Sequence, residues 1–119
     1  MDTRSKILNL EAAERLMGPI TLASGYFEVL RVEHARELAT LQRPLLAVVV
    51  ERNAAVLGAA ARAEMVAAIR VVDYVVIADY ADVDRLIERI RPREVARLET
   101  ADLSRTRRLI EDVQRSQNQ

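Results

Sequence analysis

The run LLAVVV, from Leu45 to Val50, decides the fold class of this sequence. Its length is that of a β-strand, and a strand that is apolar at every position has to be covered on both faces. Shorter apolar runs at Ile20–Ala23 and Tyr74–Ile77 have the same character, and Val95–Leu98 is predicted to add a short fourth strand. Continuous apolar strands are typical of a parallel sheet, and we expect one here.

Segments with the composition and spacing of helices separate these strands. Alternating strands and helices predict an α/β fold, an open parallel sheet flanked by helices with a Rossmann-like architecture. A chain of 119 residues has room for one such domain, which we expect to span residues 1–119. The predicted helices are Asn9–Met17 with Asn9 as N-cap, Val32–Leu41, Ala59–Val72, a helix that Asp82 caps and Pro92 ends, and Ser104–Gln114.

Composition excludes several kinds of site and partner. Positive and negative residues both number 18, so no net charge attracts nucleic acid or a membrane surface, and neither is expected as a partner. Cysteine is absent and His34 is the only histidine, which excludes disulfides, thiolate nucleophiles and multi-histidine metal sites. No metal site is expected. We find no leader segment and no apolar run approaching ~18 residues, so the cytoplasm is the expected location.

The junction between the first strand and the helix after it is the expected place for chemistry. In open parallel sheets, ligands bind beyond the carboxyl ends of the strands, near the point where the strand order reverses. The first strand runs directly into the segment Ser24–Glu37. Gly25 is predicted to allow a tight turn there, and Phe27, the only phenylalanine, is predicted to lie in the core.

The segment GYFEVLRVEH, from Gly25 to His34, resembles the signature G-x-F-D-x-x-H-x-G-H of cytidylyltransferase-like nucleotidyltransferases. In pattern it is most like the adenylyltransferase domain of ADP-heptose synthase and glycerol-phosphate cytidylyltransferase. Three further segments are similar to the family's leader helix, its arginine-led helix with the following strand, and its I-S-S-T-x-x-I helix start. These segments are Lys6–Leu16, Arg62–Ile77 and Leu103–Val113, so the resemblance covers most of the chain.

The resemblance implies a reaction and a set of contacts. In such enzymes a sugar- or polyol-phosphate attacks the α-phosphorus of a nucleoside triphosphate and pyrophosphate leaves, with CTP or ATP and Mg²⁺ as the implied cofactors. A nucleotide or phosphorylated small molecule is the implied ligand, and a homodimer is expected. The implied catalytic residues are His34, at the second motif histidine, and Arg31, which replaces the first. The implied nucleotide-binding residues are Gly25, Phe27, Glu33, Arg62, Ser104 and Thr106.

Several positions depart from the family pattern. Glu33 replaces the motif glycine and Glu28 replaces the aspartate after the phenylalanine. Two like charges about 4 Å apart repel by roughly 4 kcal/mol at an effective dielectric near 20, which is about a thousandfold in affinity. Arg31 can hold a phosphate but cannot cycle a proton. The segment Asn53–Ala61 is shorter than the family's acceptor loop and has no lysine. These changes predict a catalytically degraded site.

Each candidate has a structural alternative. His34 is either a phosphate contact or a polar residue left near a helix start. Arg62 is either a triphosphate contact or a solvated arginine, and Ser104 and Thr106 either bind phosphate through exposed N–H groups or only cap a helix. Three functions therefore stay open: a degraded nucleotidyltransferase with a residual site, an active nucleotidyltransferase, and an interaction module that binds no nucleotide.

Overall fold

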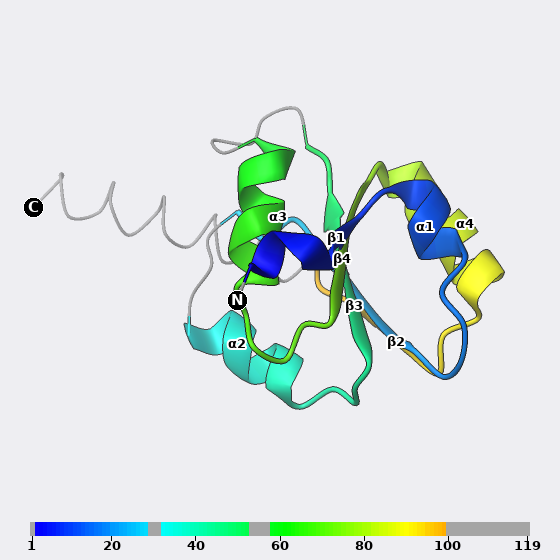
Figure 1. Cartoon of the computed structure of the whole chain (residues 1–119), viewed down its shortest axis with the longest axis horizontal. Coiled ribbons are helices and arrows are strands. Elements are labelled where there is room, and N and C mark those ends of the chain that lie inside the picture. Colours follow the sequence, from blue (N-terminus) through cyan, green and yellow to red (C-terminus); the bar gives the residue numbers. More distant parts are fainter. Residues whose placement is uncertain (1, 29–31, 53–57, 100–119) are drawn as a thin grey trace, which may run out of the picture.

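Five parallel strands form the centre of the molecule, in the order β1-β4-β3-β2-β5. The computed structural model describes residues 2–28, 32–52 and 58–99 (Figure 1). The strands are β1 (Ile7–Leu8), β2 (Thr21–Gly25), β3 (Leu45–Val50), β4 (Tyr74–Ala78) and β5 (Glu94–Arg97). The helices are the 3₁₀ helix η1 (Thr3–Lys6), α1 (Leu10–Glu14), α2 (Val32–Ala39), α3 (Ala59–Ala67) and α4 (Tyr80–Ile90).

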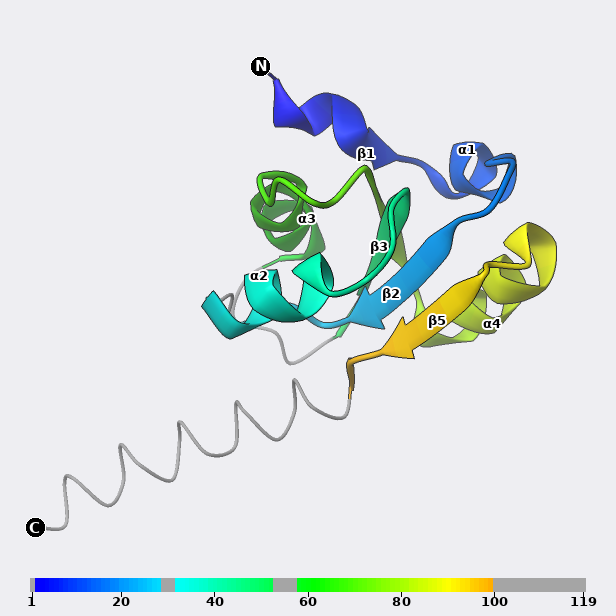
Figure 2. The same ribbon diagram turned by 90° about the horizontal axis from the view of Figure 1, so that it is seen from below.

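Helices cover both faces of the sheet, which explains why β3 is buried at every position. Leu46, Val48 and Val50 pack in one cluster with residues of α1 and α4. The alternate residues of β3 pack in a second cluster with residues of α2 and α3. Figure 2 shows the same division, with α2 and α3 on one side of the strands and α4 on the other. The predicted fold, an open parallel sheet flanked by helices, is therefore confirmed.

The predicted strands are present with small changes of boundary. Leu45–Val50 is correct at both ends, and the strand at Tyr74 continues to Ala78. β2 begins one residue later than expected and continues to Gly25, because it pairs with β3 along that length. β1 was not predicted. Its two residues pair with β4 at the sheet margin, where so short a strand leaves little apolar pattern in the sequence.

Three helix predictions are corrected. The predicted helix Asn9–Met17 is only Leu10–Glu14, although Asn9 is its N-cap and accepts a hydrogen bond from the Ala12 amide. The leader-like segment Lys6–Leu16 is accordingly not one helix, because Ile7 and Leu8 pair in the sheet. The predicted helix Ala59–Val72 ends at Ala67, since the chain turns before β4. The helix α4 begins at Tyr80 after the N-cap Asp79, so Asp82 lies in its first turn and is not the cap.

No helix within the described ranges has the length and apolar character needed to cross a bilayer. The predicted helix Ser104–Gln114 lies outside the described residues.

Asp73 links the starts of two neighbouring strands. One of its carboxylate oxygens accepts a hydrogen bond from the Leu45 amide at 2.8 Å, and the other accepts one from Arg43 Nη2 at 2.6 Å. Because Leu45 begins β3 and Asp73 immediately precedes β4, these bonds order the turn into β4. The hydrogen bond from Arg43, more than any other contact, lowers the pKa of Asp73 below its usual value.

We expect Asp73→Asn to lower the free energy of unfolding at pH 7 by roughly 1 kcal/mol, a value discounted for the partial exposure of the pair. A lowered folded-state pKa gives stability that is present above the unfolded value of 3.8 and is lost as the pH falls through the folded value. The difference from wild type should therefore shrink below that pH. Urea unfolding at pH 7 and at acidic pH measures it. Glu11→Gln, which removes an exposed carboxylate paired with Arg15, is the control.

Candidate functional site

The carboxyl ends of β2 and β5 mark the point where the strand order reverses. The chain moves from β2 to β3 on one side, whereas β5 joins the sheet on the other side of β2. The helix α2 follows β2 on one face, and α4 precedes β5 on the opposite face (Figure 2). Such a divergence leaves a crevice beyond the strand ends, where ligands of this fold class bind. We call the residues at and shortly after the carboxyl ends of β2, β3, β4 and β5 the carboxyl edge.

The turn after β2 is buried and strained. Gly25 is the last residue of β2, and its φ is not positive; the left-handed residue is Phe27, with φ of 53°. The predicted turn at Gly25 therefore lies two residues later. Phe27 is fully buried, as predicted, so its core packing holds a backbone conformation that bulky residues rarely adopt. Strain of about 1–3 kcal/mol of this kind is often found at functional sites.

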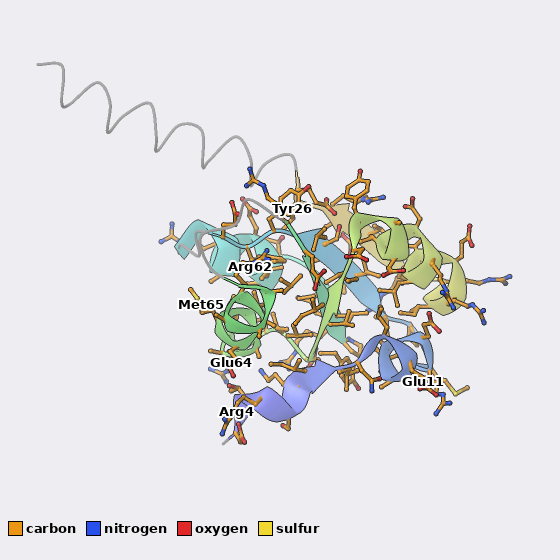
Figure 3. The ribbon with its side chains drawn as sticks, turned by 90° about the horizontal axis from the view of Figure 1, so that it is seen from above. Arg4, Glu11, Tyr26, Arg62, Glu64 and Met65 are labelled. Carbon is orange, nitrogen blue, oxygen red and sulfur yellow. The ribbon has the colours of Figure 1, made fainter. Side chains whose placement is uncertain are left out.

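Arg62 is a buried clamp between the ends of β2 and β3. Its Nη1 donates to the Tyr26 carbonyl at 2.8 Å and to the Val50 carbonyl at 3.0 Å. Only 1% of the residue is exposed, so the alternative of a solvated arginine is wrong. Figure 3 shows Arg62 on the side of α3 that faces the sheet, with Glu64 and Met65 on its outer side. At least one nitrogen of this guanidinium, Nη1, is thus hydrogen-bonded to the protein backbone.

Arg52, which follows β3, is paired with Glu28. Its Nη1 donates to Glu28 Oε2 at 2.6 Å, and its guanidinium lies 5.6 Å from the centre of the Tyr26 ring. Only 10% of the Glu28 side chain is exposed. Its other oxygen, Oε1, is buried with no hydrogen-bond partner among the described residues. Glu28 therefore neutralises the charge of Arg52, and its Oε1 can still accept a hydrogen bond.

Arg97, at the end of β5, is held in a similar way. Its Nη1 donates to Asp84 at 2.9 Å, its Nε lies 3.8 Å from Glu99 Oε1, and its guanidinium lies over the Tyr80 ring at 5.2 Å. Glu99 Oε1 is too far from Arg97 for a hydrogen bond, and this buried oxygen has no hydrogen-bond partner in the described part of the chain. Ser24 Oγ, on the neighbouring strand β2, is also buried without a hydrogen-bond partner there.

Two further acids follow the ends of the neighbouring strands β3 and β4. Glu51 follows β3, and Asp79 follows β4. The pKa of Glu51 is raised, mainly by a side-chain hydrogen bond with Asp79. A proton shared between two neighbouring carboxyl groups is held more tightly than a proton on an isolated one. Among the residues described, no group of three carboxylate or imidazole side chains is arranged to hold a metal ion.

The predicted site residues divide into three groups. Gly25, Phe27 and Arg62 come together at the carboxyl edge. Glu33 and His34 are in the first turn of α2, where only the backbone is described. Arg31, Ser104 and Thr106 lie outside the described residues.

Other residues of the carboxyl edge were not predicted as site residues. They are Glu51, Arg52, Tyr80, Arg97 and Glu99. Each lies at, or within two residues of, the end of a strand. Because ligands bind beyond the carboxyl ends of parallel strands, this position could have identified them from the sequence.

Comparison with solved structures gives a likeness in fold. No family model matches the chain, and no curated protein matches it. The crystal structure of the lipopolysaccharide core biosynthesis protein from Thermoplasma volcanium GSS1 superimposes with a TM-score of 0.57 at 18% sequence identity. The match covers 65% of this chain and 71% of that one. The fold is Rossmann-like. At this level of identity the likeness concerns the fold alone.

Proposed function

We propose that this chain is a nucleotidyltransferase-like protein that keeps a weakened nucleotide site at the carboxyl edge and no longer catalyses efficiently. The observation that carries the proposal is the state of the arginines there. Arg52 pairs with Glu28, Arg97 pairs with Asp84, and Arg62 donates to strand carbonyls. Each is engaged by protein groups that a triphosphate would have to displace.

Charge stabilisation is what nucleotidyl transfer demands of a protein. An acceptor oxygen forms a bond to the α-phosphorus while the bond to the leaving pyrophosphate breaks, so negative charge surrounds one phosphorus atom. At the described carboxyl edge, acidic side chains outnumber basic ones. The acidic residues are Glu28, Glu51, Asp79, Asp82 and Glu99, and the basic residues are Arg52, Arg62 and Arg97. This balance opposes the reaction.

The same edge retains features that suit the nucleoside part of a nucleotide. Ser24 Oγ, Glu28 Oε1 and Glu99 Oε1 have no hydrogen-bond partner among the described residues, although Glu99 Oε1 forms an ion pair with Arg97. Buried acceptors of this kind are normally satisfied. Ribose hydroxyls and base amino groups are donors of the right type. The name of the structural neighbour, a biosynthesis protein, agrees with a nucleotidyltransferase ancestry. We also propose that the protein forms a homodimer, as the family resemblance implies.

We expect the protein to release pyrophosphate from CTP or ATP far more slowly than about 1 s⁻¹, even with glycerol phosphate or heptose phosphate present. Calorimetric titration should show that CTP binds little more tightly than cytidine, and ATP little more tightly than adenosine, since the phosphates gain few contacts. Turnover near that rate would show instead that the protein is an active enzyme. Absence of binding by nucleosides and nucleotides alike would favour the interaction module.

A matched pair of variants tests the cause. Glu28→Gln removes the charge that neutralises Arg52 and should strengthen CTP binding several-fold, by roughly the 1 kcal/mol of a recovered charged contact. Glu11→Gln likewise frees an arginine, Arg15, but on α1, which Figure 3 shows away from Tyr26 and Arg62. It should leave CTP binding unchanged. Equal effects of the two substitutions would contradict a site at the carboxyl edge.

A further inference from the structure

A second cavity lies at the opposite end of the sheet, where the strands begin. Its volume is about 430 Å³, and it is lined by Thr3, Lys6, Arg43, Ala68, Arg70 and Asp73. Lys6, Arg43 and Asp73 come just before β1, β3 and β4, and Arg70 lies in the turn between α3 and β4. Figure 1 shows η1 beside α3 at this end of the molecule. We call this space the amino-end cavity.

The charges of the amino-end cavity are the reverse of those at the carboxyl edge. Its single carboxylate, Asp73, is bound by Arg43, and that hydrogen bond chiefly keeps the pKa of Asp73 low, so the pair is neutral overall. Lys6, the only lysine of the chain, donates to the Ile69 carbonyl at 3.3 Å; its charge helps to lower the pKa of Asp73, but the carboxylate that forms the close ion pair there is bound by Arg43. Arg70 has neither a hydrogen bond nor an ion pair within the described part of the chain. Two positive charges are therefore uncompensated.

We propose that the amino-end cavity binds the phosphate group of a small phosphorylated molecule. A phosphate monoester carries nearly two negative charges at neutral pH, which matches the excess of Lys6 and Arg70. A guanidinium presents a planar fork to phosphate oxygens, and the Thr3 side chain, also in the lining, has a hydroxyl that can donate to one of them. The cavity is much larger than one phosphate ion and falls in the range of small-molecule sites, so the phosphate has room to carry an organic group.

One local feature works against an anion. The cavity includes Ala68, the C-cap of α3, and the carboxyl end of a helix carries partial negative charge. The Lys6 ammonium donates to a carbonyl of this same turn, which offsets part of that charge. A helix end contributes about half an elementary charge, and this is less than the two uncompensated cations.

This site is independent of the proposed function. Six residues of β3, about 20 Å of strand, separate the two ends of the sheet. A ligand of the amino-end cavity therefore touches none of the groups at the carboxyl edge. Failure of nucleotide binding at one end has no bearing on phosphate binding at the other.

Amide NMR titration of the whole chain with inorganic phosphate and with glycerol phosphate tests the assignment. We expect saturable shifts at Thr3, Lys6, Arg70 and Asp73, without shifts at Tyr26 or Leu98, and tighter binding of glycerol phosphate than of inorganic phosphate. Shifts that grow linearly with concentration over all charged surfaces would overturn the site. Equal affinity for the two probes would overturn the phosphorylated small molecule as its ligand.

Substitutions locate the contacts. Arg70 is exposed, so Arg70→Gln should fold normally and weaken glycerol phosphate binding about tenfold, the loss of one charged hydrogen bond. Arg70→Gln combined with Lys6→Gln should abolish saturable binding. Arg89→Gln removes the same charge from an exposed position on α4 and should change nothing. If Arg70→Gln behaves like Arg89→Gln, the amino-end cavity is not the phosphate site.

Discussion

Replacing Arg62 with methionine is expected to lower the free energy of unfolding by about 2–6 kcal/mol, because two buried carbonyl groups lose their donor. Methionine keeps most of the apolar stem but donates no hydrogen bonds. The carbonyls of Tyr26 and Val50 then stay buried at the ends of β2 and β3 without the donor that satisfies them. Each unsatisfied acceptor costs about 1–3 kcal/mol, and both losses occur together.

Urea unfolding of wild type and variants at pH 7 measures this effect. Arg62→Lys keeps the positive charge without the planar fork, so it should fall between wild type and Arg62→Met. Arg89→Met, at an exposed position of α4, is the control and should change stability by less than about 0.5 kcal/mol. The experiment also separates the two roles considered for Arg62. If Arg62→Met keeps wild-type stability but loses nucleotide affinity, Arg62 is a ligand contact and not a clamp.

The strands could be predicted from the sequence because their signal is local. A run such as Leu45–Val50 has no polar side to turn toward water, so the sheet and both covering layers follow from it. The N-cap at Asn9 is equally local. The helix at Ala59 was predicted too long because what ends it is distant: the turn before β4 is fixed by Asp73, whose partners are the Leu45 amide and Arg43.

The candidate site was harder to predict, for the same reason. The resemblance implied that Gly25, Phe27 and Arg62 bind nucleotide, which stays a prediction, and the structure brings these residues together at one edge of the sheet. The burial of Arg62 depends on the packing of α3 against two strand ends, which no local pattern encodes. The pairs of Arg52 with Glu28 and of Arg97 with Asp84 join residues that are 24 and 13 positions apart. Sequence spacing alone gave no reason to pair them.

The position of Glu33 in the fold sharpens the prediction made for it from the motif. Glu33 is the second residue of α2, and backbone N–H groups at a helix start attract anions. A carboxylate in the first turn of a helix stabilises it by about 0.3–1 kcal/mol. We therefore expect a charge at this position to favour the helix and to oppose a phosphate.

Glu33→Gly is therefore expected to strengthen CTP binding, by up to about a thousandfold if the full repulsion of roughly 4 kcal/mol is relieved. Glycine should also cost the helix about 1 kcal/mol, so binding and stability should move in opposite directions. Glu33→Gln removes the charge and keeps the size, and it should recover most of the gain if repulsion dominates over steric blocking.

Adding Arg31→His should preserve the gain without restoring turnover, because the acceptor loop is still missing. Calorimetric titration measures each affinity, with Glu88→Gln on α4 as the matched loss of an exposed acid. An affinity of Glu33→Gly no higher than wild type would show that Glu33 is not what weakens the site.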